Sequence, residues 1–160
     1  MSINKEDIKK HQINIYRLCK FVKVTVNNFL RDIHYFIYWV YIYCRVPIIR
    51  RKDKIKVLFV LAELASWKTE LLYLAMLKHS RFNPILGVTD NTVEAPGSKP
   101  ILMDYLKKKS YDFIDLDKDE KSINKINPDF IIYYKPYNDS YQPAHIFKKH
   151  AKSIPIGMGY

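Results

Sequence analysis

The chain has 160 residues, a net charge of +11 and 48% hydrophobic residues, which suits one packed domain with an appendage and excludes global disorder. Its two cysteines, Cys19 and Cys44, are far apart and lack the spacing of metal ligands, so neither a disulfide framework nor a zinc site is expected. Residues 1–12 are polar and include acids, which is unlike the apolar core of a secretory signal peptide.

The basic charge is concentrated in the first third of the chain. Residues 1–54 hold 12 Lys and Arg against 4 Asp and Glu, a net +8, whereas residues 55–160 hold 15 against 12, a net +3. This asymmetry indicates an anionic partner for the first third. Anionic lipid and nucleic acid are the two partner classes that the charge suits.

A long amphipathic helix is predicted over residues 13–45. Its apolar residues recur every three or four positions, which is the period of a helix. They are Ile15, Leu18, Val22, Val26, Phe29, Ile33, Phe36, Val40 and Tyr43. Pro47 is expected to end this helix, because proline disfavours helical geometry in the residue before it.

The second half of this helix is aromatic on all sides and is followed by a basic stretch. Residues 35–44 read YFIYWVYIYC, and residues 45–54 contain five Arg and Lys. Tyr and Trp suit the membrane–water interface, and basic side chains suit anionic head groups. We therefore expect residues 1–53 to form a helical segment on the cytoplasmic face of the cell membrane, peripherally bound to its anionic surface. The expected membrane contacts are Tyr38, Trp39, Tyr41, Arg45, Arg50 and Arg51.

Three other interpretations of the helix stay open. In the first it packs on its own domain, and in the second it pairs with another copy of the chain to form a homo-oligomer. In the third it spans the membrane with Arg31 reaching the surface, although its uncharged stretch is shorter than the ~20 residues that a span needs. Nucleic acid is not an expected partner, because these aromatic residues lie in an almost wholly apolar run, which suits lipid or protein better than bases.

The rest of the chain alternates between strand-like and helix-like stretches. Strands are predicted over 54–63, 82–90, 111–116, 128–135 and 153–159. Helices are predicted over 66–80, 101–110 and 144–151, with a weakly helical stretch over 117–127. Such alternation indicates a parallel sheet with right-handed crossovers.

The expected fold is therefore α/β, a doubly wound, Rossmann-like parallel sheet over residues 54–160 with strand order 3-2-1-4-5. In such sheets ligands bind beyond the carboxyl ends of the strands, where the strand order reverses. That point lies here between the first and fourth strands. The loops at 63–68 and 135–141 and the end at 157–160 are expected to meet there.

Trp67 and Lys68 lie in the first of these loops, at the start of a predicted helix with Ser66 as its N-cap. An indole offers a platform for a sugar ring or base, and an ammonium offers a phosphate contact. The alternative is that Trp67 packs the helix on the sheet and Lys68 faces solvent. The residues alone leave both interpretations open.

Several well-known chemical motifs are absent. No GxGxxG follows the first strand, and there is no P-loop, GxSxG or HExxH. The acidic residues at 112–120 do not match a calcium loop, so we expect them to be a strand end and a solvated helix start. His145 and His150 are expected to face solvent or stack locally. No acid–base pair, metal site or cofactor is assigned.

Three stretches in a fixed order resemble the capsule and teichoic-acid polymerase family typified by the CDP-glycerol glycerophosphotransferases. Residues 55–90 resemble the start of its N-terminal domain, with matching positions at Ser66, Trp67, Lys68, Tyr73, Phe82 and Pro84. Residues 127–141 resemble its Pro-Asp…Pro-Tyr segment, at Pro128, Asp129, Pro136 and Tyr137. Residues 154–160 resemble the strand before a Tyr-Gly turn, at Gly157, Gly159 and Tyr160.

The resemblance implies the N-terminal half of a glycosyltransferase-B fold, in which a cleft separates two doubly wound domains. Such enzymes use no metal and move a sugar or polyol phosphate from an activated nucleotide to a lipid-linked or polymeric acceptor. The C-terminal domain usually holds the nucleotide. The N-terminal domain faces the acceptor and usually supplies a base shortly after its fifth strand.

This chain ends at Tyr160, where the fifth strand of that fold leads into active-site loops. The donor-binding half is therefore expected to lie outside the chain, and the fragment is expected to be inactive alone. The resemblance implies an acceptor-side domain whose substrate-binding residues are Trp67, Lys68, Pro136, Tyr137, Gly159 and Tyr160, with no catalytic residue assigned. The alternative function is a membrane-tethered interaction module without catalytic activity.

Overall fold

The structure is a computed structural model of the whole chain. It describes residues 5–65, 67–90, 95–119, 121–134, 145, 150 and 152–157, with side chains described from residue 20 onward except residue 31. The chain divides into two compact units, residues 1–48 and 49–160. Each unit is described by itself below.

The first unit is most of a single long helix, α1 (Lys5–Arg50). The helix is confirmed, but the prediction that Pro47 ends it is wrong, because the helix continues through Pro47 to Arg50. A proline inside a helix removes one hydrogen bond and crowds the preceding turn. At Pro47 only three further helical residues follow, so the disruption is confined to the last turn.

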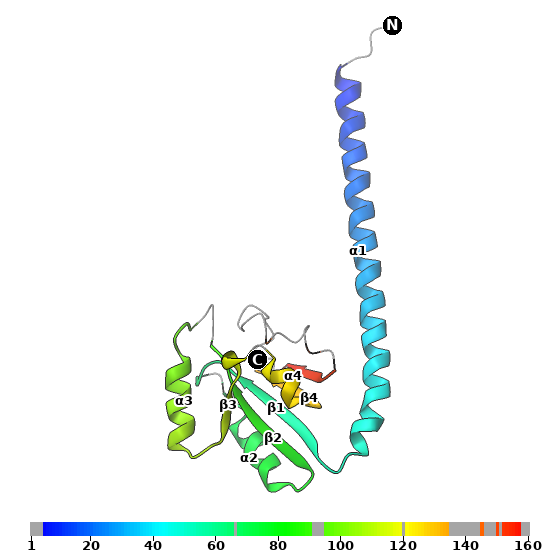
Figure 1. Cartoon of the computed structure of the whole chain (residues 1–160). Helices are drawn as coiled ribbons and strands as arrows, with labels where there is room; N and C mark the ends of the chain where they lie inside the picture. The colour runs from blue at the N-terminus through cyan, green and yellow to red at the C-terminus, as the bar shows by residue number, and fades with distance from the viewer. Residues whose placement is uncertain are drawn as a thin grey trace. The chain divides into compact units, whose positions relative to one another are not determined.

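The second unit is built on a five-stranded sheet (Figure 1). Its strands are β1 (Ile55–Leu61), β2 (Phe82–Val88), β3 (Phe113–Asp115), β4 (Phe130–Tyr133) and β5 (Ile154–Gly157). The order is β3-β2-β1-β4-β5, and every neighbouring pair is parallel. The predicted order and strand direction are therefore confirmed.

The central strand β1 is the core of this unit. Its residues from Val57 to Leu61 are almost completely buried, because strands lie on both sides of β1 and other elements cover its faces. A run of β-branched and aliphatic residues without polar alternation is typical of such a strand.

The helices of the second unit are α2 (Glu70–Lys78), α3 (Lys99–Lys108) and α4 (Ser122–Ile126), with a 3-10 turn, η1 (Leu116–Lys118). The prediction that Ser66 caps α2 is wrong, because the N-cap position is Thr69. The backbone N–H of Trp67 donates to the Leu64 carbonyl, 3.1 Å away. A turn therefore precedes α2 at this point. Of the helix predicted over 144–151, only residues 145 and 150 are described.

Gly87 in β2 allows η1 to lie close to the sheet. A Cβ atom at this position would lie 2.8 Å from Cδ1 of Leu116, which is completely buried. The close approach places the residues after β3 beside the end of β2, and the polar cluster described next depends on it.

Candidate functional site

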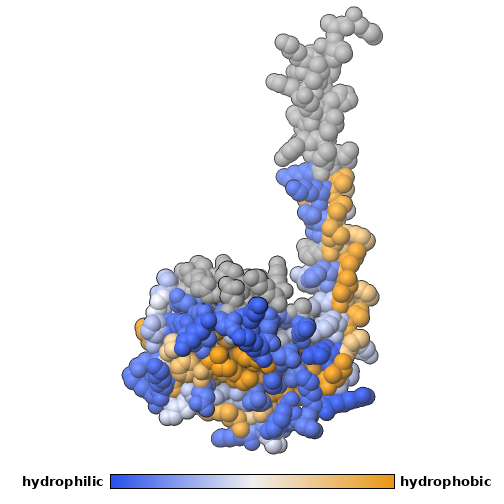
Figure 2. Space-filling view, viewed as in Figure 1, coloured by the Kyte–Doolittle hydropathy of each residue, from blue (hydrophilic) through white to orange (hydrophobic). Residues whose placement is uncertain are grey.

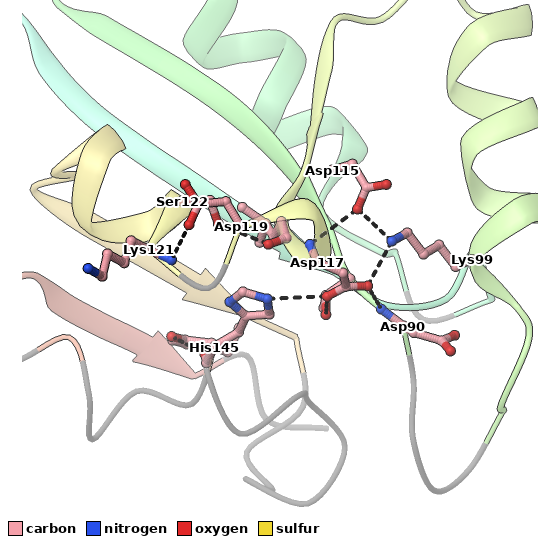
Figure 3. Close-up of polar contacts among 11 residues, drawn as sticks. Asp90, Lys99, Asp115, Asp117, Asp119, Lys121, Ser122 and His145 are labelled. Carbon is pink, nitrogen blue, oxygen red and sulfur yellow. Dashed lines mark hydrogen bonds and ion pairs between the residues drawn. The ribbon is translucent and has the colours of Figure 1, made fainter.

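Polar residues gather where β2 and β3 end (Figure 3). Thr89 and Asp90 follow β2, whereas Asp115 ends β3 and Asp117 lies in η1. Val88 and Asp115 are register partners. The two parallel strands therefore present their polar ends at the same edge of the sheet, which is the edge where α/β proteins bind ligands.

Asp117 is the centre of this cluster. Its carboxylate accepts hydrogen bonds from the Thr89 hydroxyl at 2.6 Å and from the Asp90 backbone N–H at 2.9 Å. The Lys99 ammonium lies 2.7 Å from the second carboxylate oxygen, and it also contacts Asp115 at 2.5 Å. Lys99 is the first residue of α3, so this network joins the start of α3 to the ends of β2 and β3.

The hydrogen bonds of this network favour the ionised forms of both Asp117 and Lys99. Burial by itself would raise the pKa of Asp117, but the hydrogen bonds from Lys99, Thr89 and the Asp90 N–H bring that pKa below its ordinary value. Burial would likewise lower the pKa of Lys99, but hydrogen bonds to Asp115 and Asp117 raise it. At neutral pH the Asp117 carboxylate and the Lys99 ammonium are therefore both ionised. The prediction of a strand end is confirmed for Asp115, and Asp117 lies in η1, partly exposed but paired with Lys99.

His145 approaches the same carboxylate from the segment after β4. Its Nε2 lies 3.2 Å from Oδ1 of Asp117, and the residue is only 1% exposed. The Tyr133 hydroxyl donates to the His145 carbonyl at 2.9 Å, and burial raises the pKa of Tyr133. Of the two predicted alternatives, facing solvent or stacking locally, the first is wrong for His145, because the residue is buried. His150 is also buried, with Nδ1 3.3 Å from the Asn124 side-chain oxygen.

The carboxyl ends of β1 and β4 also meet, as the strand order requires. The Tyr134 hydroxyl lies 3.1 Å from the Ala62 backbone nitrogen and accepts its hydrogen bond. The Ser98 hydroxyl donates to the Ala62 carbonyl at 2.8 Å. The chain after β1 is therefore tied both to the end of β4 and to the start of α3.

Trp67 lies inside an aromatic cluster. It is only 7% exposed, and its ring makes edge contacts with Tyr73, Tyr105 and Tyr111 at centroid distances of 6.3, 6.1 and 5.9 Å. Tyr73 belongs to α2 and Tyr105 to α3. These contacts favour the packing interpretation of Trp67, and its contact with substrate stays a prediction.

The other predicted substrate contacts are placed only in part. Lys68 is exposed at the start of α2. Pro136, Tyr137, Gly159 and Tyr160 lie outside the described residues. The meeting of all three predicted loops at one crevice therefore stays a prediction.

The residues predicted to contact membrane lie at the end of α1 and just after it. Trp39, Arg50 and Arg51 are exposed, whereas Tyr38, Tyr41 and Arg45 are half-buried. Figure 2 shows hydrophobic residues along one side of the described part of α1 with hydrophilic residues beside them. Within the part of the chain that was searched, no helix is long and apolar enough to cross a membrane.

The surface of the cluster offers hydrogen-bonding groups of both charges to a ligand. The side chains of Asp117 and Lys99 are 22% and 17% exposed, so a carboxylate acceptor and an ammonium donor both reach solvent. His145 is too deeply buried to touch a ligand and orients Asp117 instead. Among the described side chains, no group of three His, Cys, Asp or Glu is placed to hold a metal ion.

Sequence reasoning missed Thr89, Lys99 and the Asp117–His145 pair. A usable signal was present, because the second and third predicted strands both end in polar residues, as VTD at 88–90 and as IDLD at 114–117. Parallel neighbours must bring such ends together. No spacing in the sequence points to Lys99 or His145, because each arrives from a separate segment.

Comparison with known proteins adds no relative. No protein-family model, no curated protein and no solved structure matches this chain.

Proposed function

We propose that this chain is the acceptor-side domain of a membrane-associated transferase. The enzyme would move a sugar or a polyol phosphate to a lipid-linked or polymeric acceptor at the cytoplasmic face of the membrane, as capsule and teichoic-acid polymerases do. In this proposal the second unit is the N-terminal half of a glycosyltransferase-B fold. In such a fold a second domain binds the donor.

One observation carries the proposal, the ionised cluster at the carboxyl edge of the sheet. Asp117 and Lys99 are paired at 2.7 Å and partly exposed. A carboxylate accepts hydrogen bonds from sugar or polyol hydroxyls, and an ammonium contacts phosphate. A polyol phosphate chain carries both groups in every repeat, so it is the acceptor class that this cluster suits best.

The doubly wound arrangement is part of the same proposal. Trp67 contacts both α2 and α3 through Tyr73 and Tyr105, which supports one shared face for these two helices. The chain crosses from β3 back over the sheet to β4. A right-handed crossover in that reverse direction would place α4 on the opposite face.

Membrane attachment through α1 is supported by its exposed aromatic residues. Phe36 and Trp39 are 69% and 68% exposed. Removing such a side chain from water would lower the free energy by about 1.5–3 kcal/mol. A bilayer surface would cover this apolar face, and the basic residues after it would contact anionic head groups.

Acceptor binding tests the role of the cluster. The 160-residue chain is titrated with short glycerol-phosphate oligomers and, separately, with neutral sugar oligomers, followed by calorimetry. We expect the unmodified chain to bind the phosphate oligomers. We expect Asp117→Asn to bind them about tenfold or more weakly, because a hydrogen bond to a charged group contributes about 1.5–3 kcal/mol. The matched control is Asp104→Asn, which removes an exposed carboxylate paired with Lys108 on α3. Equal weakening in both variants, or no binding by the unmodified chain, would overturn the assignment.

A second experiment tests the membrane part separately. Vesicles of phosphatidylcholine with phosphatidylglycerol are sedimented with the unmodified chain and with Phe36→Asn/Trp39→Asn. We expect the double variant to stay largely in the supernatant while its helix content is unchanged. Leu71→Asn/Leu77→Asn is the control, because both residues are exposed apolar side chains of α2. Sedimentation that the α1 changes do not reduce would contradict membrane attachment through α1.

The second candidate function is a membrane-tethered interaction module without catalytic activity. The burial of Trp67 and His145 favours it, because neither ring is open to a ligand. This candidate predicts vesicle binding without any binding of acceptor oligomers. The two experiments above therefore separate the candidates.

A further inference from the structure

A second charged pocket lies at the opposite end of β1 from the Asp117 cluster. Its volume is about 530 Å³, and all of its lining belongs to the second unit. The lining residues are Arg50, Arg51, Lys52, Asp53, His79, Ser80 and Arg81. The segments meet because Ile55 N–H donates to the Arg81 carbonyl at 2.9 Å where β1 and β2 begin.

The pocket has an excess of positive charge. Three arginines and Lys52 line it, against the single carboxylate of Asp53. The Lys52 ammonium forms a salt bridge with Asp129, which is 1% exposed and lies 2.6 Å away. Arg50, Arg51 and Arg81 are exposed, so the pocket presents guanidinium groups to solvent.

Arg81 is held in place before any ligand arrives. Its guanidinium donates to the Arg50 carbonyl, and its backbone N–H donates to Nδ1 of His79 at 3.2 Å. A guanidinium carries five N–H donors, so this contact leaves others for a ligand. The hydroxyl of Ser80 adds one more donor at the same place. Guanidinium groups match the geometry of phosphate oxygens, which they bind in pairs.

We propose that this pocket binds the phosphate of an anionic phospholipid head group. The inference rests on the proposed membrane attachment and adds a site for one lipid phosphate to it. The pocket begins at Arg50, the last residue of α1. The same short stretch of chain therefore ends the helix with the exposed apolar face and begins the phosphate pocket. That continuity favours a lipid over a free phosphate as the source of the ligand.

A charge-matched pair of variants tests the pocket. Arg51→Gln/Arg81→Gln removes two charges from the lining, and Lys107→Gln/Lys118→Gln removes two exposed charges elsewhere in the same unit. Glycerol 3-phosphate, followed by calorimetry, measures phosphate binding without a membrane. Vesicles of phosphatidylcholine with phosphatidic acid measure binding of the lipid. If the double variant fails to fold, Arg51→Gln alone tests the pocket, because it keeps the contact between Arg81 and Arg50.

We expect the pocket variant to bind glycerol 3-phosphate and the vesicles about tenfold or more weakly than the control, since a direct hydrogen bond from a guanidinium to phosphate contributes about a factor of ten or more. Equal losses in the two variants would show general electrostatics and overturn the pocket. A pocket-specific loss with glycerol 3-phosphate but not with vesicles would overturn the lipid source. Absence of vesicle binding by every protein contradicts the proposed membrane attachment, whereas glycerol 3-phosphate still reports on the pocket.

Discussion

Replacing Trp67 by alanine should destabilise the second unit strongly. The side chain is 7% exposed and touches three tyrosine rings. Deleting a buried tryptophan costs about 3–5 kcal/mol, and folded domains are stable by only about 5–15 kcal/mol. Trp67→Ala should therefore remove a large fraction of the free energy of unfolding.

Trp67→Phe should cost much less, about 1 kcal/mol. The indole Nε1 is buried and has no hydrogen-bond partner in the described part of the chain. A buried donor without a partner costs about 1–3 kcal/mol, and phenylalanine removes that donor while it keeps a ring in the cluster. The cost of lost packing is thereby partly offset.

Amide hydrogen exchange of β1 measures both effects, because this strand lies in the core and its protection reports on opening of the whole unit. Trp39→Ala is the control, since Trp39 is exposed on α1 and its removal should change the free energy by no more than about 0.5 kcal/mol. A cost below about 1 kcal/mol for Trp67→Ala would refute the packing argument. The sugar-platform interpretation of the indole would then gain support.

Three further changes test the fold and the cluster. Gly87→Ala should cost about 1–3 kcal/mol in urea unfolding, because the new Cβ meets Leu116; a neutral result, equal to that of Gly157→Ala in open space, would contradict the close approach. Asp117 has a pKa below its ordinary value despite its burial, so the stability that it confers is present above about pH 3.9 and is lost as the pH falls through its folded pKa. Urea midpoints from pH 6 to pH 2.5 should fall less steeply in Asp117→Asn than in the unmodified chain, and parallel curves would disprove this. Asp129→Ala should cost about 1–3 kcal/mol, because it leaves the Lys56 backbone N–H and the Lys52 ammonium without their carboxylate acceptor; thermal unfolding with an unchanged midpoint would count against it.

The helix and the sheet could be predicted because their signals are local. The apolar period of residues 13–45 predicts a helix, and the run from Val57 to Leu61 predicts a strand buried on both faces. The alternation of strands and helices then favours parallel pairing, and the predicted order 3-2-1-4-5 is the order that the structure has. These features depend on neighbours along the chain.

The environment of individual side chains could not be predicted in this way. The sequence around His145 and Trp67 does not distinguish them from exposed loop or helix residues, yet both are buried. Their partners, Asp117 and Tyr105, come from other segments, and a spacing along the chain does not encode such a distance. Lys99 likewise meets Asp117 only because α3 starts beside the end of β3.

The sequence by itself thus determined which segments are helices and strands, and in which direction the strands run, because periodicity and connection length act locally. Only the tertiary structure decided which polar groups share an edge of the sheet and which aromatic rings are covered. It joined Thr89, Lys99, Asp117 and His145 into one network. The physical reason is that burial and ion pairing depend on distances between segments, and the packed sheet sets those distances.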